Sequence, residues 1–350
     1  MAVHAVDLQE QLAIQRQKVD VDHFDITVRE LIRMAAENEL HTAPVYQRKF
    51  RWDESKESRL IESLLLNFPI PSIFVAANQD GTWEVVDGLQ RISTLIHFAG
   101  DSAELWERVG KDAPLKLTGL RDLTDFVGLA LNDLPAAIKL AFFKRALRVT
   151  ALSDKSNKDT RFDLFERLNS GGVALSPQEV RAAIYQGQFN DLLRELANFP
   201  EFKATVRLQQ GKEDDGTREE MVLKFFAYYH DQDGFSGAVT AFLNNFMETK
   251  ADTFDIDVER TRFIEMARAI NTILDGAEFV KANYGPTPLV ELEAVMVAAA
   301  RVLDSHGSIA TPPDGWIEDA ELVRSSTGGT NTKAMLAARI NRARQLLTPP

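Results

Sequence analysis

The chain has 350 residues, of which 45% are hydrophobic and 26% are charged, as in an ordinary globular protein of one or two domains. Because it contains no cysteine, disulfides, thiolate nucleophiles and cysteine-ligated metal sites are excluded. No apolar run approaches the roughly 20 residues of a membrane span, and the N-terminus lacks the blocks of a signal peptide. We therefore expect a cytoplasmic protein without a membrane partner.

The formal net charge of −12 argues against a protein that binds nucleic acid over its whole surface. Three basic stretches run against this average, at 48–51, at 139–148 and from 324 onward. Each is typical of a solvated helix face that balances acidic ones. The charge therefore stays compatible with a local basic site.

The first part of the chain predicts a mixture of helices and strands. Residues 24–40 predict a helix because apolar residues recur at helical spacing: Val28, Leu31, Ile32 and Ala35. Asp53 is expected to cap a second helix, whose apolar stripe ends before two prolines: Leu60, Ile61, Leu64, Leu65 and Phe68, then Pro69 and Pro71. Residues 73–77 and 82–86 predict a β-hairpin, since Gly81 can adopt the positive φ that closes its turn.

The second strand of this hairpin leads directly into Asp87 and Gly88. A helix is expected to follow, with an inward face at helical spacing: Ile92, Leu95, Ile96 and Ala99. Residues 146–152 predict a strand that returns to the sheet, and 160–168 a short helix. Ser176 and Glu179 form a capping box, with Pro177 at the first helical position.

Beyond residue 190 nearly everything predicts helix, at 219–230, 237–248, 257–274, 289–303 and 332–347. We therefore predict an α+β fold. A domain at 20–188 contains a small mixed sheet, and a domain at 189–350 is mostly α-helical.

The best candidate site is the segment 85–91. A glycine at a strand-to-helix turn lets the backbone approach a ligand, and the N–H groups and dipole of the following helix favour a phosphate. Arg91 adds a guanidinium fork that suits phosphate oxygens. Asp87 could hold Mg²⁺ or position a water, and Gln90 could orient that water or contact a base. A purely structural turn, with Asp87 as a cap and Arg91 in a surface ion pair, is the simpler interpretation of this pattern alone.

Two other segments could contact a ligand. Basic and aromatic residues alternate in 46–52, which includes Tyr46, Gln47 and Arg48, and this composition suits a nucleotide or nucleic acid. The alternative is an extended segment whose aromatic rings pack on the core. In 165–172, Arg167 and Asn169 precede two glycines that could form an anion nest, although helix caps explain the same residues.

Taken in order, these segments resemble a known family. The resemblance lies in Gln47-Arg48 with Trp52, in 69–71, in 86–91 with Thr94, in 165–169 and in 175–179. Together they are similar to the ParB-like DGQQR-motif family, which includes the GmrS-type specificity domains of modification-dependent restriction systems. The similarity covers roughly residues 25–205, more than half of the chain.

The resemblance implies a ParB/sulfiredoxin-like fold for the N-terminal domain. It also implies NTP binding and hydrolysis by the motif matched here by Asp87, Gly88, Gln90 and Arg91, with Asp87 as the candidate Mg²⁺ ligand. Further ligand contacts are expected from Tyr46, Gln47, Arg48, Gly88, Thr94, Arg167 and Asn169. The implied role is bacterial defence against phage or foreign DNA, in which modified DNA and an effector nuclease or toxin are the partners.

The chain departs from the family pattern in two ways. Leu89 stands where the motif usually has a glutamine, which removes one polar side chain. The six histidines are scattered singly, and we find no HNH nuclease domain. If DNA is cut, a separate protein is expected to do it.

Two other functions stay open. The first is a non-catalytic ParB-like adapter that binds DNA or a protein and keeps the pocket only for structure. The second, more remote, is a HEPN-like ribonuclease, because Arg301 and His306 have the R-x₄-H spacing of that class and Arg91 and His97 have a five-residue version.

Overall fold

The computed structural model describes residues 20–41, 52–78, 80–153, 176–212, 215–282 and 285–350, with the single positions 8, 12 and 162. The chain forms two compact units, residues 1–175 and 176–350. We call them the sheet unit and the helical unit. The sequence placed a domain boundary between 188 and 189, whereas the units divide between 175 and 176.

The sheet unit is built around a five-stranded mixed sheet. Its strands are β1 (Val21–Thr27), β2 (Leu40–His41), β3 (Ile73–Ala77), β4 (Trp83–Asp87) and β5 (Ala146–Leu152). Their order in the sheet is β1-β5-β3-β4-β2. The β1–β5 and β3–β4 pairs are antiparallel, and the β3–β5 and β2–β4 pairs are parallel. The predicted α+β class with a small mixed sheet is therefore confirmed.

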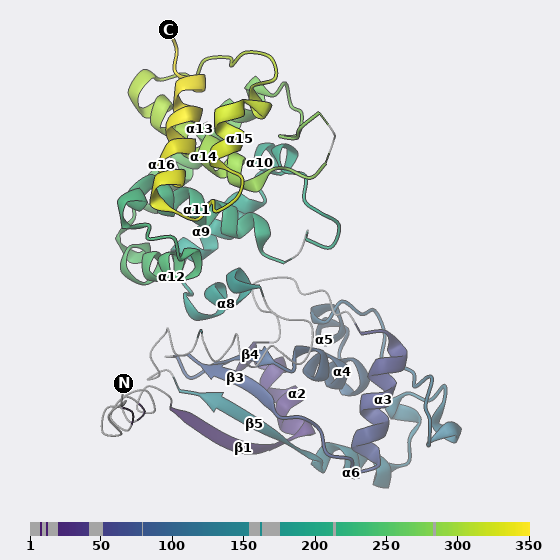
Figure 1. The fold of residues 1–350 in the computed structure, drawn as a ribbon. Coiled ribbons are helices and arrows are strands. Elements are labelled where there is room, and N and C mark those ends of the chain that lie inside the picture. The colour runs from purple at the N-terminus through teal and green to yellow at the C-terminus, as the bar shows by residue number, and fades with distance from the viewer. Residues whose placement is uncertain are drawn as a thin grey trace. The chain divides into compact units, whose positions relative to one another are not determined.

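Five α-helices accompany this sheet in the described residues: α2 (Val28–Ala36), α3 (Glu54–Leu65), α4 (Leu89–Ala99), α5 (Ala103–Arg108) and α6 (Ala136–Lys144). Two short 3₁₀ helices, η1 (Thr124–Phe126) and η2 (Leu131–Asp133), precede α6. Helices α2, α3 and α4 lie on the same side of the sheet (Figure 1). Their apolar faces join the inward side chains of the strands in one core, which includes Leu31, Ile61, Val75, Ile92 and Val149.

The predicted helix at 24–40 is wrong at both ends. Residues 21–27 form β1, which pairs with β5 from Val21 opposite Leu152 to Thr27 opposite Ala146. Thr27 ends the strand and caps α2, because its Oγ1 accepts a hydrogen bond from the N–H of Glu30 at 3.3 Å. Most side chains of β1 are exposed, so this edge strand lacks the apolar alternation that would have revealed it.

The other predictions for this unit fare better. The hairpin, the helix capped by Asp53 and the strand at 146–152 are confirmed, and Gly81 has a φ of 85° in its turn. Within the predicted stripe of α3 and its C-terminal end, Leu60, Ile61 and Leu64 are buried, but Phe68 is exposed. The predicted helix at 160–168 lies outside the described residues.

The helical unit begins with α8 (Pro177–Ile184), α9 (Gln188–Ala197), α10 (Pro200–Thr205) and α11 (Thr217–Asp231). It continues with α12 (Val239–Thr249), α13 (Ile256–Ile273), α14 (Leu289–His306), α15 (Ala320–Ser325) and α16 (Lys333–Leu347), and with three 3₁₀ helices, η4 (Gln232–Gly234), η5 (Ala251–Thr253) and η6 (Trp316–Glu318). Each long helix that the sequence predicted beyond residue 190 is present. Helix α14 packs against α11, α13 and α16, and a buried run at 292–300 shows that it is the central helix of this unit.

Among the helices that the structure describes, none combines the length and the apolar character needed to cross a bilayer.

Candidate functional site at the β4–α4 turn

Gly88 joins the end of β4 to the start of α4. Its φ of 103° lies in the left-handed region, which is costly for a residue with a side chain. A Cβ built on Gly88 would lie 3.1 Å from Ile73 Cγ1 and 3.2 Å from Arg91 Nη2. Both the backbone conformation and the close neighbours therefore require glycine, as the strand–turn–helix prediction assumed.

The sheet is irregular immediately before this turn. Val75 pairs with Val85, but Phe74 pairs with Asp87, so Val86 is an extra residue in β4. Irregularities of this kind change the direction of the following side chains and are frequent beside active sites. Here the shift determines how Asp87 leaves the sheet edge, and nothing in the sequence indicated it.

Arg91 turns back from α4 to the strand ends. Its Nη2 donates to Asp87 Oδ2 at 2.7 Å, and its Nη1 donates to the carbonyl oxygens of Ser72, at 3.1 Å, and of Pro71. Burial lowers the pKa of Arg91, and the neighbouring carboxylate of Asp87 opposes this effect. Arginine nevertheless stays charged at neutral pH, so an ion pair closes the turn.

The two partners of this ion pair are not equally accessible. The Arg91 side chain is 12% exposed, whereas that of Asp87 is 40% exposed. The second carboxylate oxygen of Asp87, Oδ1, accepts no hydrogen bond from a described residue. Asp87 is therefore the more accessible charged group of the turn. To bind a ligand, Arg91 would have to break at least one of its hydrogen bonds to Asp87, Ser72 or Pro71.

Gln90 connects the turn to a segment that the sequence also singled out. Its Oε1 accepts a hydrogen bond from the N–H of Trp52 at 3.1 Å. Trp52 directly follows 42–51, which carries Tyr46, Gln47 and Arg48 and lies outside the described residues. At the other end of this segment, His41 pairs with Glu84 of β4. The two described residues that flank the segment are thus held beside β4 and α4.

The remaining predicted site residues differ in position. Thr94 is fully buried, and its hydroxyl donates to the Gln90 carbonyl at 2.8 Å, so the described contacts of Thr94 stay within α4. Leu89 is buried in the core, so its side chain takes no part in the polar contacts of the turn. Arg167 and Asn169 lie outside the described residues.

Asp87 is the carboxylate that the β4–α4 turn itself offers to a metal ion. Across the described residues, no group of three or more histidine, aspartate or glutamate side chains is arranged to hold a metal ion. Mg²⁺ in nucleotide sites commonly takes one or two carboxylates together with phosphate oxygens and waters. Asp87 fits that mode through Oδ1, with the phosphates of a ligand supplying further oxygens.

Sequence reasoning missed a buried ionic group beneath α4. Glu57 of α3 is fully buried, and its Oε2 lies 2.6 Å from His97 Nδ1. Its other oxygen accepts from Lys111 Nζ at 3.2 Å. These contacts fix α3 to α4, so His97 has a structural partner. No sequence pattern indicated this group, because its three residues come from separate segments.

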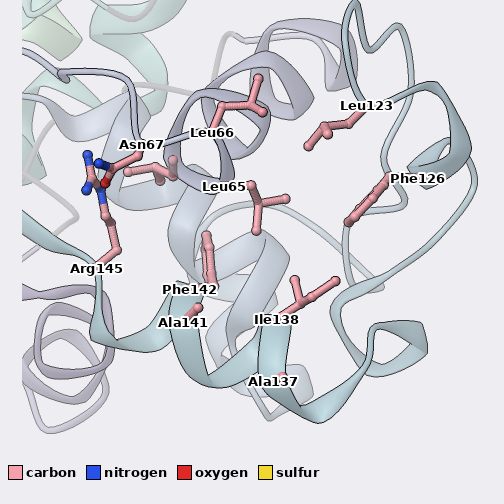
Figure 2. Close-up of a pocket in the computed structure, with 11 residues that line it drawn as sticks. Leu65, Leu66, Asn67, Leu123, Phe126, Ala137, Ile138, Ala141, Phe142 and Arg145 are labelled. Atoms are coloured by element: carbon pink, nitrogen blue, oxygen red, sulfur yellow. The ribbon is translucent and has the colours of Figure 1, made fainter.

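A second missed feature is a largely apolar cavity of about 400 Å³ in the sheet unit. It lies between the end of α3, η1 and α6, where Leu65, Phe126 and Ile138 line it (Figure 2). Arg145 and Asn67 are polar residues that also line it. It is separate from the contacts that form the β4–α4 turn.

The two residues with ribonuclease-like spacing lie at the C-terminal half of α14. Arg301 donates to Gln232 Oε1 at 2.7 Å and to the carbonyl oxygens of Tyr228 and Tyr229. His306 is exposed, and its Nδ1 lies 2.7 Å from Ser305 Oγ. Arg301 therefore has a structural role in joining α14 to α11.

Comparison with known proteins gives one match. Residues 28–186 match the family model of the GmrSD restriction endonuclease, N-terminal domain. This range contains β2–β5 and α2–α6 of the sheet unit, with the β4–α4 turn inside it. The match supports a GmrSD-type N-terminal domain in this chain. It therefore suggests that the protein is a component of a restriction-type system. No curated protein and no solved structure matches the chain significantly.

Proposed function

We propose that the sheet unit is a ParB-like module that binds a nucleoside triphosphate at the β4–α4 turn and hydrolyses it with Mg²⁺. In this view the chain is a specificity or regulatory protein of an anti-phage restriction system. It senses DNA and acts with a separate effector nuclease or toxin. The observation that carries this proposal is the Gly88 turn, which joins a strand end, a helix N-terminus, an accessible carboxylate and an arginine within a GmrSD-type domain.

The turn offers a phosphate both shape and charge. Gly88 supplies no side chain to cap α4, and the N-terminus of such a helix attracts anions. When a nucleotide binds, the Arg91 guanidinium would break its hydrogen bond to Asp87 and donate to phosphate oxygens instead. A guanidinium can contact two such oxygens at once. Asp87, once released, would hold Mg²⁺, which neutralises phosphate charge when it is bound. Gln90 would orient the attacking water and keep Trp52 close.

A non-catalytic adapter is the second candidate, and one observation favours it. Arg91 already has three hydrogen-bond acceptors in Asp87, Ser72 and Pro71. A turn that serves only as structure would be expected to satisfy its arginine in this way. In that case the module would bind DNA or a protein through another surface.

A phosphate-release assay over all four nucleoside triphosphates, with and without DNA, tests the hydrolase. We expect Asp87→Asn and Arg91→Lys to reduce release at least about a hundredfold, since each removes an electrostatic contact of the reacting phosphates. The matched control is Asp25→Asn, because Asp25 pairs with Arg148 at 2.7 Å on the exposed edge of the same sheet. Equal release by all four proteins would reject hydrolysis at this turn. DNA binding without nucleotide binding would favour the adapter.

A further inference from the structure

The apolar cavity of the sheet unit has the size of a binding site. Its volume of about 400 Å³ lies in the range of natural small-molecule pockets, roughly 300–1,000 Å³. Its walls come from the end of α3, from η1 and from α6 (Figure 2). On α6 the lining residues recur at helical spacing and form one face of the helix: Ala137, Ile138, Ala141 and Phe142. The cavity can therefore hold a small organic molecule.

Most of the lining is apolar and is still partly open to water. The half-buried lining residues include Leu65, Leu123, Phe126 and Ile138. Phe68 and Val127, which each directly follow a lining residue in the chain, are 52% and 49% exposed. Because removing apolar surface from water is favourable, an apolar occupant would be stabilised by these walls.

Arg145 is the one charged side chain among the described residues of the lining. It is the C-cap residue of α6, and its Nη2 donates to the carbonyl oxygen of Phe68 at 3.3 Å. Phe68 directly follows the segment 64–67, which lines the cavity. The guanidinium is therefore held against the α3 side of the cavity.

Arg145 uses little of its hydrogen-bonding capacity. A guanidinium carries five N–H groups, and within the described part of the chain the side chain of Arg145 donates only to the Phe68 carbonyl. Its Nε is buried without a partner there, and no described carboxylate pairs with it. Arg148, three residues later, has such a partner in Asp25 at 2.7 Å. The charge of Arg145 therefore lacks a counter-ion among the described residues.

Two helix ends explain how this cation is tolerated. A positive charge is favoured at the C-terminus of a helix, and Arg145 both caps α6 and contacts the chain that leaves α3. The last carbonyls of α3, at Glu62, Ser63 and Leu64, already accept backbone N–H groups. They need no further donor, so Arg145 keeps most of its N–H groups for a ligand.

From these contacts we propose that the cavity binds a small apolar molecule that carries one carboxylate, such as a fatty acid or an aryl-substituted carboxylic acid. The apolar part lies between α3, η1 and α6, and the carboxylate accepts from Arg145. Such a hydrogen bond is charge-assisted and stronger than one to a neutral group. This site is independent of the proposed nucleotide site, because none of its lining residues belongs to the β4–α4 turn.

Calorimetric titration of the full-length protein, without nucleotide, tests the proposal. The probes are octanoate, 3-phenylpropanoate and octanamide, which has the length of octanoate but no charge. We expect saturable binding of at least one carboxylate with one molecule per chain, and the two carboxylates show whether a flexible chain or a ring is preferred. Octanamide should bind at least about tenfold more weakly than octanoate. Equal binding of octanoate and octanamide, or no saturable binding of either carboxylate, would overturn the proposal.

Arg145→Met removes the charge and keeps an unbranched side chain. We expect its affinity for octanoate to fall to that for octanamide, while octanamide binds as it does to the wild type. Lys144→Met is the matched control, because Lys144 is the exposed neighbour of Arg145 and does not line the cavity. If Arg145→Met still prefers octanoate, or if Lys144→Met loses that preference equally, the carboxylate does not bind at Arg145.

Ala141→Trp tests the location of the apolar part. Ala141 is an exposed residue of α6 that lines the cavity, so a large side chain there should occupy the space and weaken octanoate and octanamide alike. Unchanged binding of both probes would place the site elsewhere and contradict the proposal. If Arg145→Met does not fold, the wild-type comparison and Ala141→Trp decide the question.

Discussion

At Gly88, two separate costs would accompany any side chain: a backbone cost from the left-handed φ and a steric cost from Ile73 and Arg91. Gly81 carries only the first, because its φ is 85° and a Cβ there would meet nothing within 4 Å. The pair of glycines therefore separates backbone strain from crowding.

We predict that Gly81→Ala lowers the free energy of unfolding by about 1 kcal/mol. Gly88→Ala should lower it by roughly 2–4 kcal/mol, because crowding adds to strain. Urea unfolding followed by tryptophan fluorescence measures both, since Trp52, Trp83 and Trp106 all lie in the sheet unit. Equal losses for the two variants would show that the contacts around Gly88 are looser than described.

Glu62 shows how one buried carboxylate can hold a loop. Its oxygens accept the backbone N–H groups of Arg121, Asp122 and Leu123 at 2.8–3.2 Å. Burial raises the pKa of Glu62, but these three donors outweigh it, and the pKa falls below its ordinary value of 4.5. Its stabilisation is thus complete above the pKa of the unfolded state and is lost as the pH falls through the lower, folded-state pKa.

We predict that Glu62→Gln costs about 2 kcal/mol at neutral pH, because a neutral amide replaces a charged acceptor of three N–H groups. The difference from wild type should shrink below pH 4.5, as the wild-type carboxylate becomes protonated. Urea unfolding across this range measures it. Glu104→Gln, at a side chain that is 77% exposed, should have little effect. A difference that does not depend on pH would exclude the charge as its cause.

At the scale of elements, local signals determined which predictions succeeded. Caps and turns that use a residue and its immediate neighbours, such as Asp53, Gly81 and the box from Ser176 to Glu179, were all recognisable in the sequence. Strand β1 was missed because its exposed side chains carry no apolar alternation. Its position depends on pairing with β5, more than a hundred residues later, and one sequence shows no such pairing.

The cap of α8 has a contact that an ordinary cap lacks. Ser176 Oγ accepts from the N–H of Glu179 at 3.2 Å and also donates to the Asp215 carbonyl at 2.6 Å. Thr332, the cap of α16, accepts from Met335 at 3.2 Å and has no such second bond among the described contacts.

We therefore predict that Thr332→Ala destabilises the helical unit by about 1 kcal/mol, and that Ser176→Ala costs about 1 kcal/mol more, for the second bond. Unfolding followed by circular dichroism at helical wavelengths compares them. Equal losses would show that the bond to Asp215 contributes nothing to stability.

At the scale of the whole molecule, α8 connects the family match to the helical unit. The matched range ends at residue 186, yet the helical unit starts at 176. The buried contact of Arg181 with Glu220 explains why: it joins α8 to α11. The predicted boundary between 188 and 189 follows the glycine at 187, which ends α8, and it stays a prediction.

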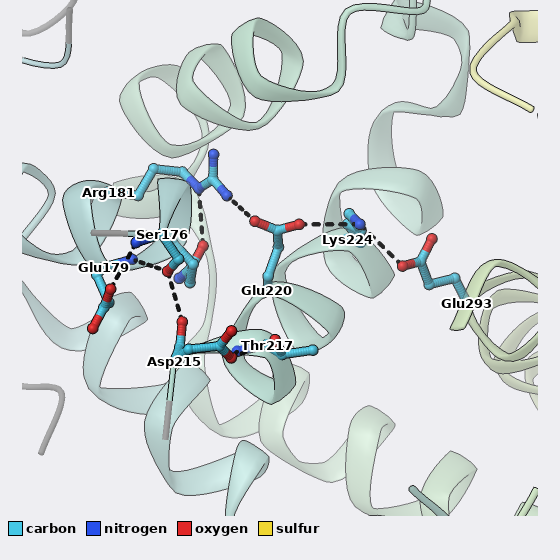
Figure 3. A network of polar contacts seen from close by, with 9 residues as sticks. Ser176, Glu179, Arg181, Asp215, Thr217, Glu220, Lys224 and Glu293 are labelled. Carbon is cyan, nitrogen blue, oxygen red and sulfur yellow. Dashed lines mark hydrogen bonds and ion pairs between the residues drawn. The ribbon is translucent and has the colours of Figure 1, made fainter. Parts of the chain in front are cut away.

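We predict that a fragment of residues 176–350 unfolds at a higher urea concentration than a fragment of 189–350. The shorter fragment loses α8 and with it the contact of Arg181 with Glu220, although Lys224 still pairs with Glu220 (Figure 3), so we expect a loss of about 1–3 kcal/mol. Similar urea midpoints of unfolding for the two fragments would show that α8 does not stabilise the helical unit, and would favour a domain boundary after residue 188.

The candidate site was predictable in part. The glycine turn with Asp87, Gln90 and Arg91 was recognisable because its residues are adjacent in the sequence. The register shift at Val86, the hydrogen bond from Trp52 to Gln90 and the inward direction of Leu89 were not. Each depends on segments that come together only in the folded sheet.

The most direct test of the nucleotide site is the stability of the protein against each Mg²⁺–nucleoside triphosphate, measured for wild type, Asp87→Asn and Asp25→Asn. At a hundredfold excess over its Kd, one nucleotide should stabilise the wild type and Asp25→Asn by about 2.7 kcal/mol, and Asp87→Asn distinctly less. If no nucleotide stabilises the wild type, or if Asp87→Asn is stabilised equally, the β4–α4 turn is not the nucleotide site.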